Sequence, residues 1–180
     1  MVRNSYQVIV VGGGFAGITT AYVCAQNNLS VLLIERGKFP GSKNLFGGII
    51  YRKSIAQIIP AFWEKAPIER NITKETLWFL DNDSVVELGF QGLRYAQPPY
   101  NKFSVIRNRF DKWYAQQAEN EGVEIINETL VTDILFEKKG LIKRKASGVI
   151  LEDKTKIYSD VVVIAEGCIG NLTQKSGLLK

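Results

Sequence analysis

Hydrophobic and polar residues follow three different patterns along the chain, and the first of them is the clearest. Residues 6–11 form an almost unbroken apolar run, which is typical of a strand buried on both faces of a parallel sheet. Residues 15–27 carry Ile18 and Tyr22 at helical spacing, and residues 30–34 form a second apolar run. The pattern predicts a βαβ unit, in which a helix joins two parallel strands.

The middle of the chain, residues 52–106, is less regular. It predicts a short helix at 54–59 that Pro60 ends, and then a hairpin with strands at 76–80 and 85–90. Much of the aromatic content lies here. We interpret it as core, with an apolar substrate pocket as the alternative. The side chains concerned are Trp63, Trp78, Phe79, Tyr95 and Tyr100.

The last part opens with an amphipathic stretch, residues 108–121, which predicts a helix ended by Gly122. A strand at 123–126 follows. Three runs then predict an antiparallel meander, and a final apolar run predicts a buried parallel strand at 161–165. The meander runs are residues 129–136, 146–151 and 156–158. The chain as a whole therefore predicts an α/β fold.

Composition narrows the class of protein. The 180 residues are 46% hydrophobic and 23% charged, which fits a globular chain with a sizeable core. Histidine is absent, so no imidazole can serve as base or metal ligand, and hydrolase and metalloenzyme chemistry are disfavoured. Neither a signal peptide nor an apolar stretch of about 18 residues is evident. We expect a cytoplasmic protein, with peripheral attachment to the inner face of a membrane as an option.

Cationic residues and cysteines indicate little further chemistry. The net charge is +5, and cations gather at residues 138–145, which we interpret as a solvated hairpin tip. The alternative is a patch for an acidic partner or an anionic membrane. Nucleic acid is disfavoured because no aromatic residue is interleaved with these cations. Cys24 and Cys168 belong to no CxxC pair, so we expect two small buried residues and no disulfide or metal site.

A glycine motif after the first strand carries the candidate chemistry. Residues 12–17 read GGGFAG, a GxGxxG pattern between a strand and a helix. Gly12 permits the tight turn, Gly14 lets the backbone approach a pyrophosphate, and Gly17 allows close packing of helix and strand. The positive end of the helix then favours the phosphates. The motif predicts a site for a dinucleotide.

Glu35 ends the second strand, 18 residues after Gly17, close to the spacing of the dinucleotide fingerprint. Its carboxylate is placed to accept hydrogen bonds from the adenosine ribose, and its charge would repel the 2′-phosphate of NADP. FAD and NAD share the same ADP moiety, so the fingerprint leaves these two open.

The segment after Glu35 distinguishes them through a resemblance. Residues 35–51 read ERGKFPGSKNLFGGIIY, a glycine-dense stretch that we expect to be a loop passing close to an extended ligand. This pattern resembles the FixC flavoproteins, which are relatives of electron-transfer flavoprotein:quinone oxidoreductases and, more distantly, of geranylgeranyl reductases. Further stretches resemble the family in the same order: 59–62, 66–70, 106–107, 109–113 and 160–167.

The resemblance implies a glutathione-reductase-type FAD-binding Rossmann fold, in which a three-stranded meander replaces the second crossover helix. It implies that Arg107 lies near the FAD phosphates or ribityl chain, that the main chain around Val131 packs on the adenine, and that residues 165–167 line the adenosine side. A surface role for Arg107, and a plain loop role for Lys43 and Asn44, are the alternatives. The expected cofactor-binding residues are Gly12, Gly14, Phe15, Ala16, Gly17, Glu35, Arg36, Lys43, Asn44, Gly47, Gly48, Arg107, Val131, Ala165, Glu166 and Gly167.

The sequence also departs from the family pattern. FixC-type proteins are longer, and their second FAD motif, with a Gly-Asp pair, has no counterpart after Gly170. We therefore expect an FAD-binding domain that is incomplete at the C-terminus, formed by residues 1–51 and 105–180, with residues 52–104 as an inserted part of a substrate or partner domain. The missing half would be supplied in cis or in trans, and the chain alone is expected to bind FAD weakly or not at all.

The resemblance implies an enzyme that takes electrons from an electron-transfer flavoprotein and delivers them to a quinone or a ferredoxin-like carrier. Catalysis then rests on the cofactor, and we assign no catalytic residue and no metal. Alternatives with the same fold are a reductase of isoprenoid double bonds and an aromatic hydroxylase. A non-catalytic subunit of a split flavoprotein and an NAD-dependent dehydrogenase are alternatives of other classes.

Overall fold

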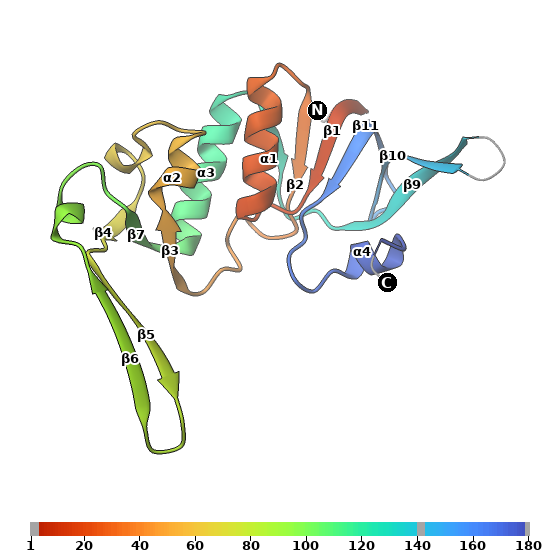
Figure 1. The fold of residues 1–180 in the computed structure, drawn as a ribbon. Helices are drawn as coiled ribbons and strands as arrows, with labels where there is room; N and C mark the ends of the chain where they lie inside the picture. Colours follow the sequence, from red (N-terminus) through yellow and green to blue (C-terminus); the bar gives the residue numbers. More distant parts are fainter. Residues whose placement is uncertain (1–3, 140–142, 179–180) are drawn as a thin grey trace. The chain divides into compact units, whose positions relative to one another are not determined.

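The computed structural model describes residues 4–139 and 143–178, and the chain forms two compact units (Figure 1). The first unit contains Met1–Leu45 and Asp111–Lys180, and the second contains Phe46–Phe110. These boundaries lie within six residues of those expected from the sequence. The assignment of the second unit to a substrate or partner domain stays a prediction.

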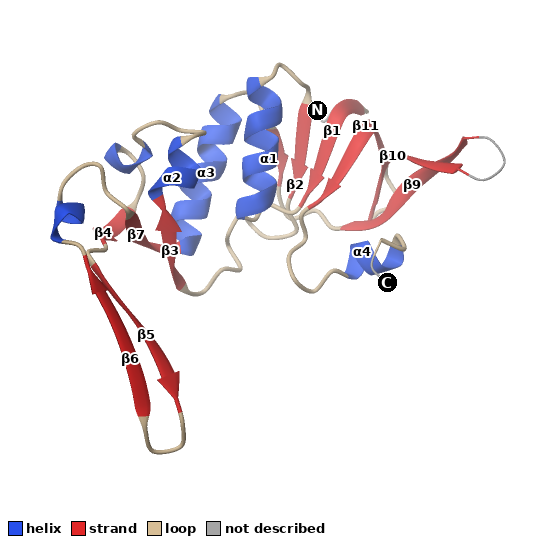
Figure 2. Ribbon diagram, in the orientation of Figure 1, coloured by secondary structure: helices blue, strands red, loops and turns tan. Residues whose placement is uncertain are grey.

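A six-stranded sheet forms the centre of the first unit, in the order β8-β2-β1-β11-β10-β9. The strands β8, β2, β1 and β11 are parallel, and β9 and β10 continue the sheet as an antiparallel ribbon (Figure 2). The strands are β1 (Ser5–Val11), β2 (Val31–Ile34), β8 (Glu124–Ile126), β9 (Val131–Lys139), β10 (Lys143–Leu151) and β11 (Lys156–Ile164). The α/β fold with a meander crossover is therefore confirmed.

The strands predicted at 156–158 and 161–165 form one continuous strand in the structure. The third meander run and the last parallel strand are a single strand, β11, whose start pairs with β10 while its length up to Ile164 pairs with β1. The expectation of a buried strand at 161–165 was wrong in part, because Val161 is 51% exposed and the residues after it are only partly buried. This end of the sheet has less cover than the apolar run suggested.

Helix α1 packs on the parallel part of the sheet, and helix α3 packs against α1. Helix α1 (Phe15–Gln26) follows β1, and its residues Ile18 and Ala21 are completely buried. Helix α3 (Arg107–Asn120) is followed two residues later by Gly122, whose φ of 102° is the left-handed conformation expected just after a helix end. From α3, Tyr114 packs against α1 and shares a 3.0 Å hydrogen bond with Thr19. Burial raises the pKa of the Tyr114 hydroxyl.

The second unit contains a sheet that the sequence did not reveal. Strands β3 (Gly47–Tyr51), β7 (Lys102–Ile106) and β4 (Ile68–Asn71) form an antiparallel sheet in that order, so the expected loop at 41–51 ends in a strand. Helix α2 (Arg52–Ala56) follows β3, and short 3-10 turns lie at Phe62–Glu64 and Leu93–Ala96. The aromatic rings of Phe62, Trp63, Tyr100 and Phe103 pack together beside this sheet.

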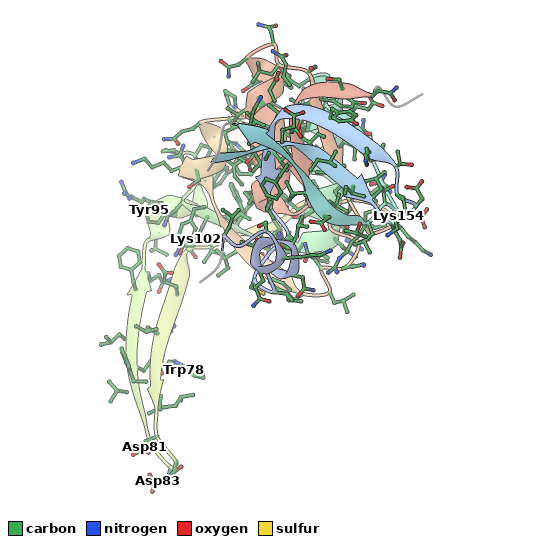
Figure 3. The ribbon with its side chains drawn as sticks, turned by 90° about the vertical axis from the view of Figure 1, so that its right-hand side faces the viewer. Trp78, Asp81, Asp83, Tyr95, Lys102 and Lys154 are labelled. Atoms are coloured by element: carbon green, nitrogen blue, oxygen red, sulfur yellow. The ribbon has the colours of Figure 1, made fainter. Side chains whose placement is uncertain are left out.

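The predicted hairpin is present as β5 (Lys74–Leu80) and β6 (Val85–Gln91), and all of its residues are exposed. Figure 3 shows the Trp78 side chain on this hairpin and Asp81 and Asp83 at its turn. The core interpretation of Trp78 and Phe79 was wrong, since they are 60% and 55% exposed. An apolar run predicts a strand, but it does not say whether another element covers that strand.

The structure also bears on the expectations for the two cysteines and for the cationic hairpin tip. Cys24 is half-buried, but Cys168 is exposed, so the interpretation of both cysteines as buried was wrong for Cys168. Strands β9 and β10 pair up to Lys139 and Lys143, while residues 140–142, the expected tip, lie outside the described part of the chain. No helix in that described part is long and apolar enough to cross a membrane.

Candidate functional site

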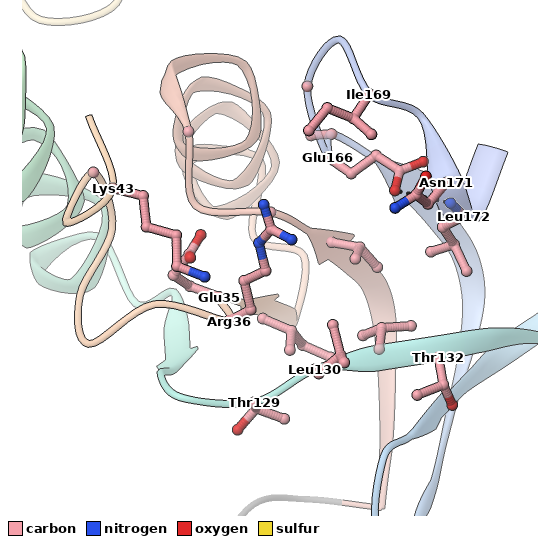
Figure 4. Close-up of a pocket in the computed structure, with 18 of the residues that line it drawn as sticks. Glu35, Arg36, Lys43, Thr129, Leu130, Thr132, Glu166, Ile169, Asn171 and Leu172 are labelled. Carbon is pink, nitrogen blue, oxygen red and sulfur yellow. Dashed lines mark hydrogen bonds between the residues drawn. The ribbon is translucent and has the colours of Figure 1, made fainter. Parts of the chain in front are cut away.

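A pocket of about 570 Å³ opens in the first unit at the carboxyl ends of β1, β2 and β11 (Figure 4). Its walls come from the turn after β1, the segment after β2, the start of β9 and the segment after β11. The chain runs from β1 to β2 on one side and returns through β11 on the other, so the sheet order reverses beside β1. Ligands of open α/β sheets bind at such a switch point.

Backbone contacts leave no room for side chains at two glycines of the turn. A Cβ on Gly17 would lie 1.9 Å from the carbonyl oxygen of Gly12, and one on Gly12 would lie 2.4 Å from that of Ala165. Gly12 also has a φ of 108°, a conformation that L side chains rarely adopt. The turn and the start of α1 therefore pack directly against the end of β11.

Gly14 differs from these two glycines. It lines the pocket, and a Cβ built on it would meet no protein atom within 4 Å. It is also the N-cap of α1, and no side-chain hydrogen bond caps this helix start. The first N–H groups of a helix have no partner within the helix, and together with the helix dipole they attract anions. An absent Cβ at Gly14 leaves space for a phosphate against these groups.

Both oxygens of Glu35 accept hydrogen bonds from the backbone. Oε2 accepts from the N–H of Gly13 at 2.7 Å, and Oε1 accepts from the N–H of Gly37 at 2.6 Å. Each carboxylate oxygen has a second lone-pair site, so Glu35 can still accept from a ligand hydroxyl. The two bonds fix the carboxylate in the pocket wall and tie the glycine turn to the end of β2.

A buried carboxylate on α3 holds the segment that carries Lys43. Asp111 is completely buried, and its Oδ2 accepts a 2.5 Å hydrogen bond from the Asn44 amide. Gly41 has a φ of 85°, and a Cβ there would lie 2.4 Å from the Asp111 Cβ. Gly41, Lys43 and Asn44 all line the pocket. Asn44 thus uses its amide to position the loop, while the Lys43 side chain is exposed.

The wall after β11 is built around Glu166 and a short helix, α4 (Asn171–Lys175). The Glu166 carboxylate accepts hydrogen bonds from the N–H of Leu172 at 2.9 Å and from the N–H and hydroxyl of Thr173, both at 2.7 Å. Partial burial by itself raises the pKa of Glu166, but these hydrogen bonds and the nearby charge of Arg36 outweigh it and lower the pKa below its ordinary value. Glu166 therefore serves the protein's own helix.

Ten of the sixteen expected residues line this pocket: Gly12, Gly14, Glu35, Arg36, Lys43, Asn44, Val131, Ala165, Glu166 and Gly167. Three others, Phe15, Ala16 and Gly17, belong to α1 and do not line it. The Phe15 ring packs against Tyr114 at a centroid distance of 5.2 Å. The binding roles of all these residues stay predictions.

The remaining three expected residues, Gly47, Gly48 and Arg107, belong to the second unit. Gly47 pairs with Ile106 across β3 and β7, and Gly48 leaves room for the Arg107 side chain, which would lie 3.5 Å from a Cβ there. The Arg107 guanidinium lies 5.9 Å from the Phe46 ring centre. The expected role of Arg107 beside a cofactor stays a prediction.

Sequence reasoning missed ten lining residues. Three of them, Val11, Ile34 and Gly41, lie within two residues of expected ones. The other seven lie on two segments and are Thr129, Leu130, Thr132, Ile169, Asn171, Leu172 and Lys175. Val131 alone was expected from the start of β9, and no cofactor-binding residue was expected after Gly167. A helix of five residues has no periodic apolar pattern that could reveal it. The one available signal was Glu166, a carboxylate a few residues before a polar stretch.

Comparison with known proteins assigns the chain to a protein family. Residues 7–168 match the FAD dependent oxidoreductase family. The chain belongs to this family. Its members' name gives FAD as the cofactor and oxidoreduction as the activity, and the matched residues include the glycine turn and the pocket lining up to Gly167.

Curated relatives confirm the resemblance to FixC. Protein FixC of Bradyrhizobium diazoefficiens is 34% identical over 179 residues, which are 99% of this chain and 40% of the relative. YgcN of Escherichia coli, named a probable electron transfer flavoprotein-quinone oxidoreductase, is 42% identical over 178 residues, again 99% of this chain and 40% of the relative. The chain thus spans about two fifths of the length of the curated relatives that it matches.

Solved structures confirm the fold. A geranylgeranyl bacteriochlorophyll reductase-like protein from Thermoplasma acidophilum aligns with a TM-score of 0.78 and 21% identity, over 98% of this chain and 43% of that protein. The myxobacterial chondrochloren halogenase CndH, an FAD-dependent halogenase, aligns with a TM-score of 0.74 and 24% identity, over 96% of this chain and 39% of that protein. At this identity the likeness extends to the fold and not to the substrate.

Proposed function

We propose that the first unit binds the ADP moiety of FAD in the pocket at the ends of β1, β2 and β11. The observation that carries the proposal is the turn at Gly14, where an open Cβ position adjoins the uncapped start of α1. The N–H groups of this turn would hold the pyrophosphate. Glu35, fixed by Gly13 and Gly37, would accept from the ribose hydroxyls and repel a 2′-phosphate.

We further propose that the complete flavoprotein takes electrons from an electron-transfer flavoprotein and delivers them to a quinone. FAD, when bound, supplies the redox chemistry, and the protein supplies binding, orientation and electrostatics. The name of the relative YgcN, a probable electron transfer flavoprotein-quinone oxidoreductase at 42% identity, supports these two partners over reduction of isoprenoid double bonds. The similarity to the reductase-like structure concerns the fold alone.

A titration tests the first part of the proposal. The 180-residue chain is expected to leave purification without stoichiometric FAD, because it corresponds to only 40% of the length of its relatives FixC and YgcN. ADP and FAD should then bind weakly with similar affinities in equilibrium dialysis, and FMN and NADP should not compete. Binding of FMN as strong as that of FAD would contradict the assignment, since FMN has no ADP moiety.

A chimera tests the second part. Residues 1–180 replace the matching part of E. coli YgcN, and the purified chimera is loaded with FAD. Reduced electron-transfer flavoprotein should reduce the bound flavin, and a soluble quinone analogue should reoxidise it, both followed by flavin absorbance. Unaltered YgcN is the control. Reoxidation by a prenyl substrate and not by the quinone would replace this proposal with the geranylgeranyl-reductase alternative.

A further inference from the structure

A second pocket, of about 330 Å³, lies entirely within the second unit. Its lining comes from the start of α2 and from the stretch between the Leu93–Ala96 turn and β7. Three of its lining residues are cations, Arg52, Lys53 and Arg94, and two are the tyrosines Tyr95 and Tyr100. Among the residues that the structure describes, no carboxylate lines it.

The three cations also have no ion-pair partner within the described residues. The ion pairs of this unit join other residues, Lys102 with Glu75 and Arg109 with Glu69. Like charges gathered in one concave site repel each other, and the repulsion grows where protein displaces water. A pocket that collects three positive charges and no negative one is therefore stabilised by any anion that enters it.

Arg52 is held in place before any ligand arrives. Its Nε donates a 2.5 Å hydrogen bond to the carbonyl oxygen of Tyr100, and its guanidinium lies 5.9 Å from the ring centre of Trp63. Its backbone N–H donates to the carbonyl oxygen of Asn101 at 3.0 Å. The residue is half-buried, and its two terminal guanidinium nitrogens have no partner among the residues described. This leaves a positioned fork of donors of the kind that binds phosphate bidentately.

Arg94 and Lys53 supply the remaining charge. The Arg94 guanidinium lies 4.6 Å from the Tyr95 ring centre and donates a 2.7 Å hydrogen bond to the Tyr95 hydroxyl. This arrangement fixes the side chain on its own neighbour and leaves other N–H groups for a ligand. Lys53 is exposed and adds a point charge with three donors.

We propose that this second pocket binds the phosphate group of a phosphorylated ligand. Two guanidinium groups and one ammonium group match the double charge of a phosphate monoester better than the single charge of a carboxylate. The volume of about 330 Å³ is near the lower end for ligand pockets, so a phosphate with a short organic group fits it. The two sources of such a group are a soluble metabolite and the headgroup of a lipid.

Isothermal titration of the 180-residue chain with inorganic phosphate, in a phosphate-free buffer, tests the proposal. Acetate and chloride at the same ionic strength are the reference anions. Phosphate should bind saturably and at least about tenfold more tightly than acetate. Equal affinity for phosphate, acetate and chloride would show that the pocket attracts any anion by its charge alone, and this would overturn the proposal.

Variants assign the binding to this pocket. Arg94→Gln and Lys53→Gln alter exposed side chains, so both should fold, and each should weaken phosphate binding about tenfold. Lys65→Gln removes an exposed cation of the same unit outside the pocket and is the matched control, with unchanged affinity expected. Unchanged affinity in both Arg94→Gln and Lys53→Gln would overturn the proposal.

The first pocket also attracts phosphates, so one further variant separates the two sites. Gly14→Ala should leave phosphate binding at the second pocket intact while it impairs ADP binding at the first. The outcome for the second pocket is thus independent of the proposed FAD site. Loss of phosphate binding in Gly14→Ala, with retention in Arg94→Gln, would assign all binding to the first pocket and overturn the proposal.

Two titrations distinguish the sources of the phosphate. Glycerol 3-phosphate represents a soluble ligand, and phosphatidylcholine vesicles with and without phosphatidic acid represent a membrane. Binding of glycerol 3-phosphate without retention on vesicles supports the soluble source. Retention that needs phosphatidic acid and is lost in Arg94→Gln supports the headgroup source. Absence of both interactions contradicts the proposal.

Discussion

The two walls of the first pocket are held in place by different kinds of interaction. The wall of residues 12–17 and 35–37 is fixed by backbone packing at Gly12 and Gly17 and by two backbone hydrogen bonds to Glu35. The wall of residues 165–175 is fixed by side-chain hydrogen bonds of Glu166 and Lys175 and by one ion pair.

Glu166 holds the start of α4. At the other end of this helix, Lys175 donates to the carbonyl oxygen of Thr132 at 2.9 Å and lies 3.1 Å from Asp133. Exposed ion pairs contribute little and are screened by salt. The glycine wall should therefore be rigid, whereas the α4 wall should open more readily and respond to pH and salt.

Substitution of Gly17 should give the largest effect on the glycine wall. A Cβ at this position would lie 1.9 Å from the Gly12 carbonyl oxygen, so Gly17→Ala forces the helix and the turn apart. We expect a loss of about 3 kcal/mol in the free energy of unfolding, a large part of the stability of a typical domain. Urea denaturation measures it. A loss below about 0.5 kcal/mol would show that the turn is adaptable.

Glu35→Gln comes next in size. The amide of glutamine offers one oxygen acceptor where the carboxylate accepts from both Gly13 and Gly37, so one backbone N–H loses its acceptor and faces an amide NH2 donor. We expect a loss of about 2 kcal/mol in unfolding free energy. Glu119→Gln, on the exposed side of α3, is the control and should cost almost nothing. Equal effects of the two substitutions would contradict a structural role for Glu35.

The glycine wall is also the part that the sequence could predict. Gly12, Gly14, Gly17 and Glu35 lie within 24 residues, and an apolar run on either side determines the strand, turn and helix that bring them together. Their geometry follows from local conformation and one parallel strand pair. Such short-range information is present in the order of residues alone.

In the wall of residues 165–175, Ala165, Glu166 and Gly167 were expected, but the part formed by α4 could not be predicted, because a long-range contact holds its far end. Lys175 meets Thr132 across 43 residues, and α4 itself has five residues with no periodic pattern. The sheet of β3, β7 and β4 escaped prediction for a similar reason: β3 begins with two glycines, which are rare in strands, and its partner β7 lies some 50 residues later.

Glu166→Gln tests the α4 wall and should have a smaller effect. The pKa of Glu166 is lowered in the folded chain, so its contribution is complete above the ordinary pKa of a glutamate and is lost as the pH falls through the lowered pKa. Solvent screening limits this contribution to about 1 kcal/mol at neutral pH.

The measurement for Glu166 is the difference in unfolding free energy between the parent and Glu166→Gln from pH 7 to pH 3. The difference should shrink toward zero at the acid end, and amide exchange in residues 171–175 should already be faster in the variant at pH 7. Glu152→Gln, an exposed carboxylate in the same unit, controls for general acid effects. A difference that is constant with pH would show that Glu166 acts through packing and not through its charge.

Gly14→Ala should have the smallest effect on stability and is the sharpest test of the comparison. It lies three residues from Gly17 in the same turn, yet an added Cβ would meet no protein atom within 4 Å, and its φ of −80° suits alanine. The free energy of unfolding should change by less than about 0.5 kcal/mol, since the lost entropy of the unfolded chain offsets a slightly poorer helix cap.

The new methyl group in Gly14→Ala would, however, occupy the space in which a pyrophosphate approaches the N–H groups of α1. Dialysis against ADP should therefore detect no binding by a variant that melts like the parent. If Gly14→Ala binds ADP like the parent, the phosphates do not lie at this turn. If it unfolds as easily as Gly17→Ala, Gly14 serves the fold and not the ligand.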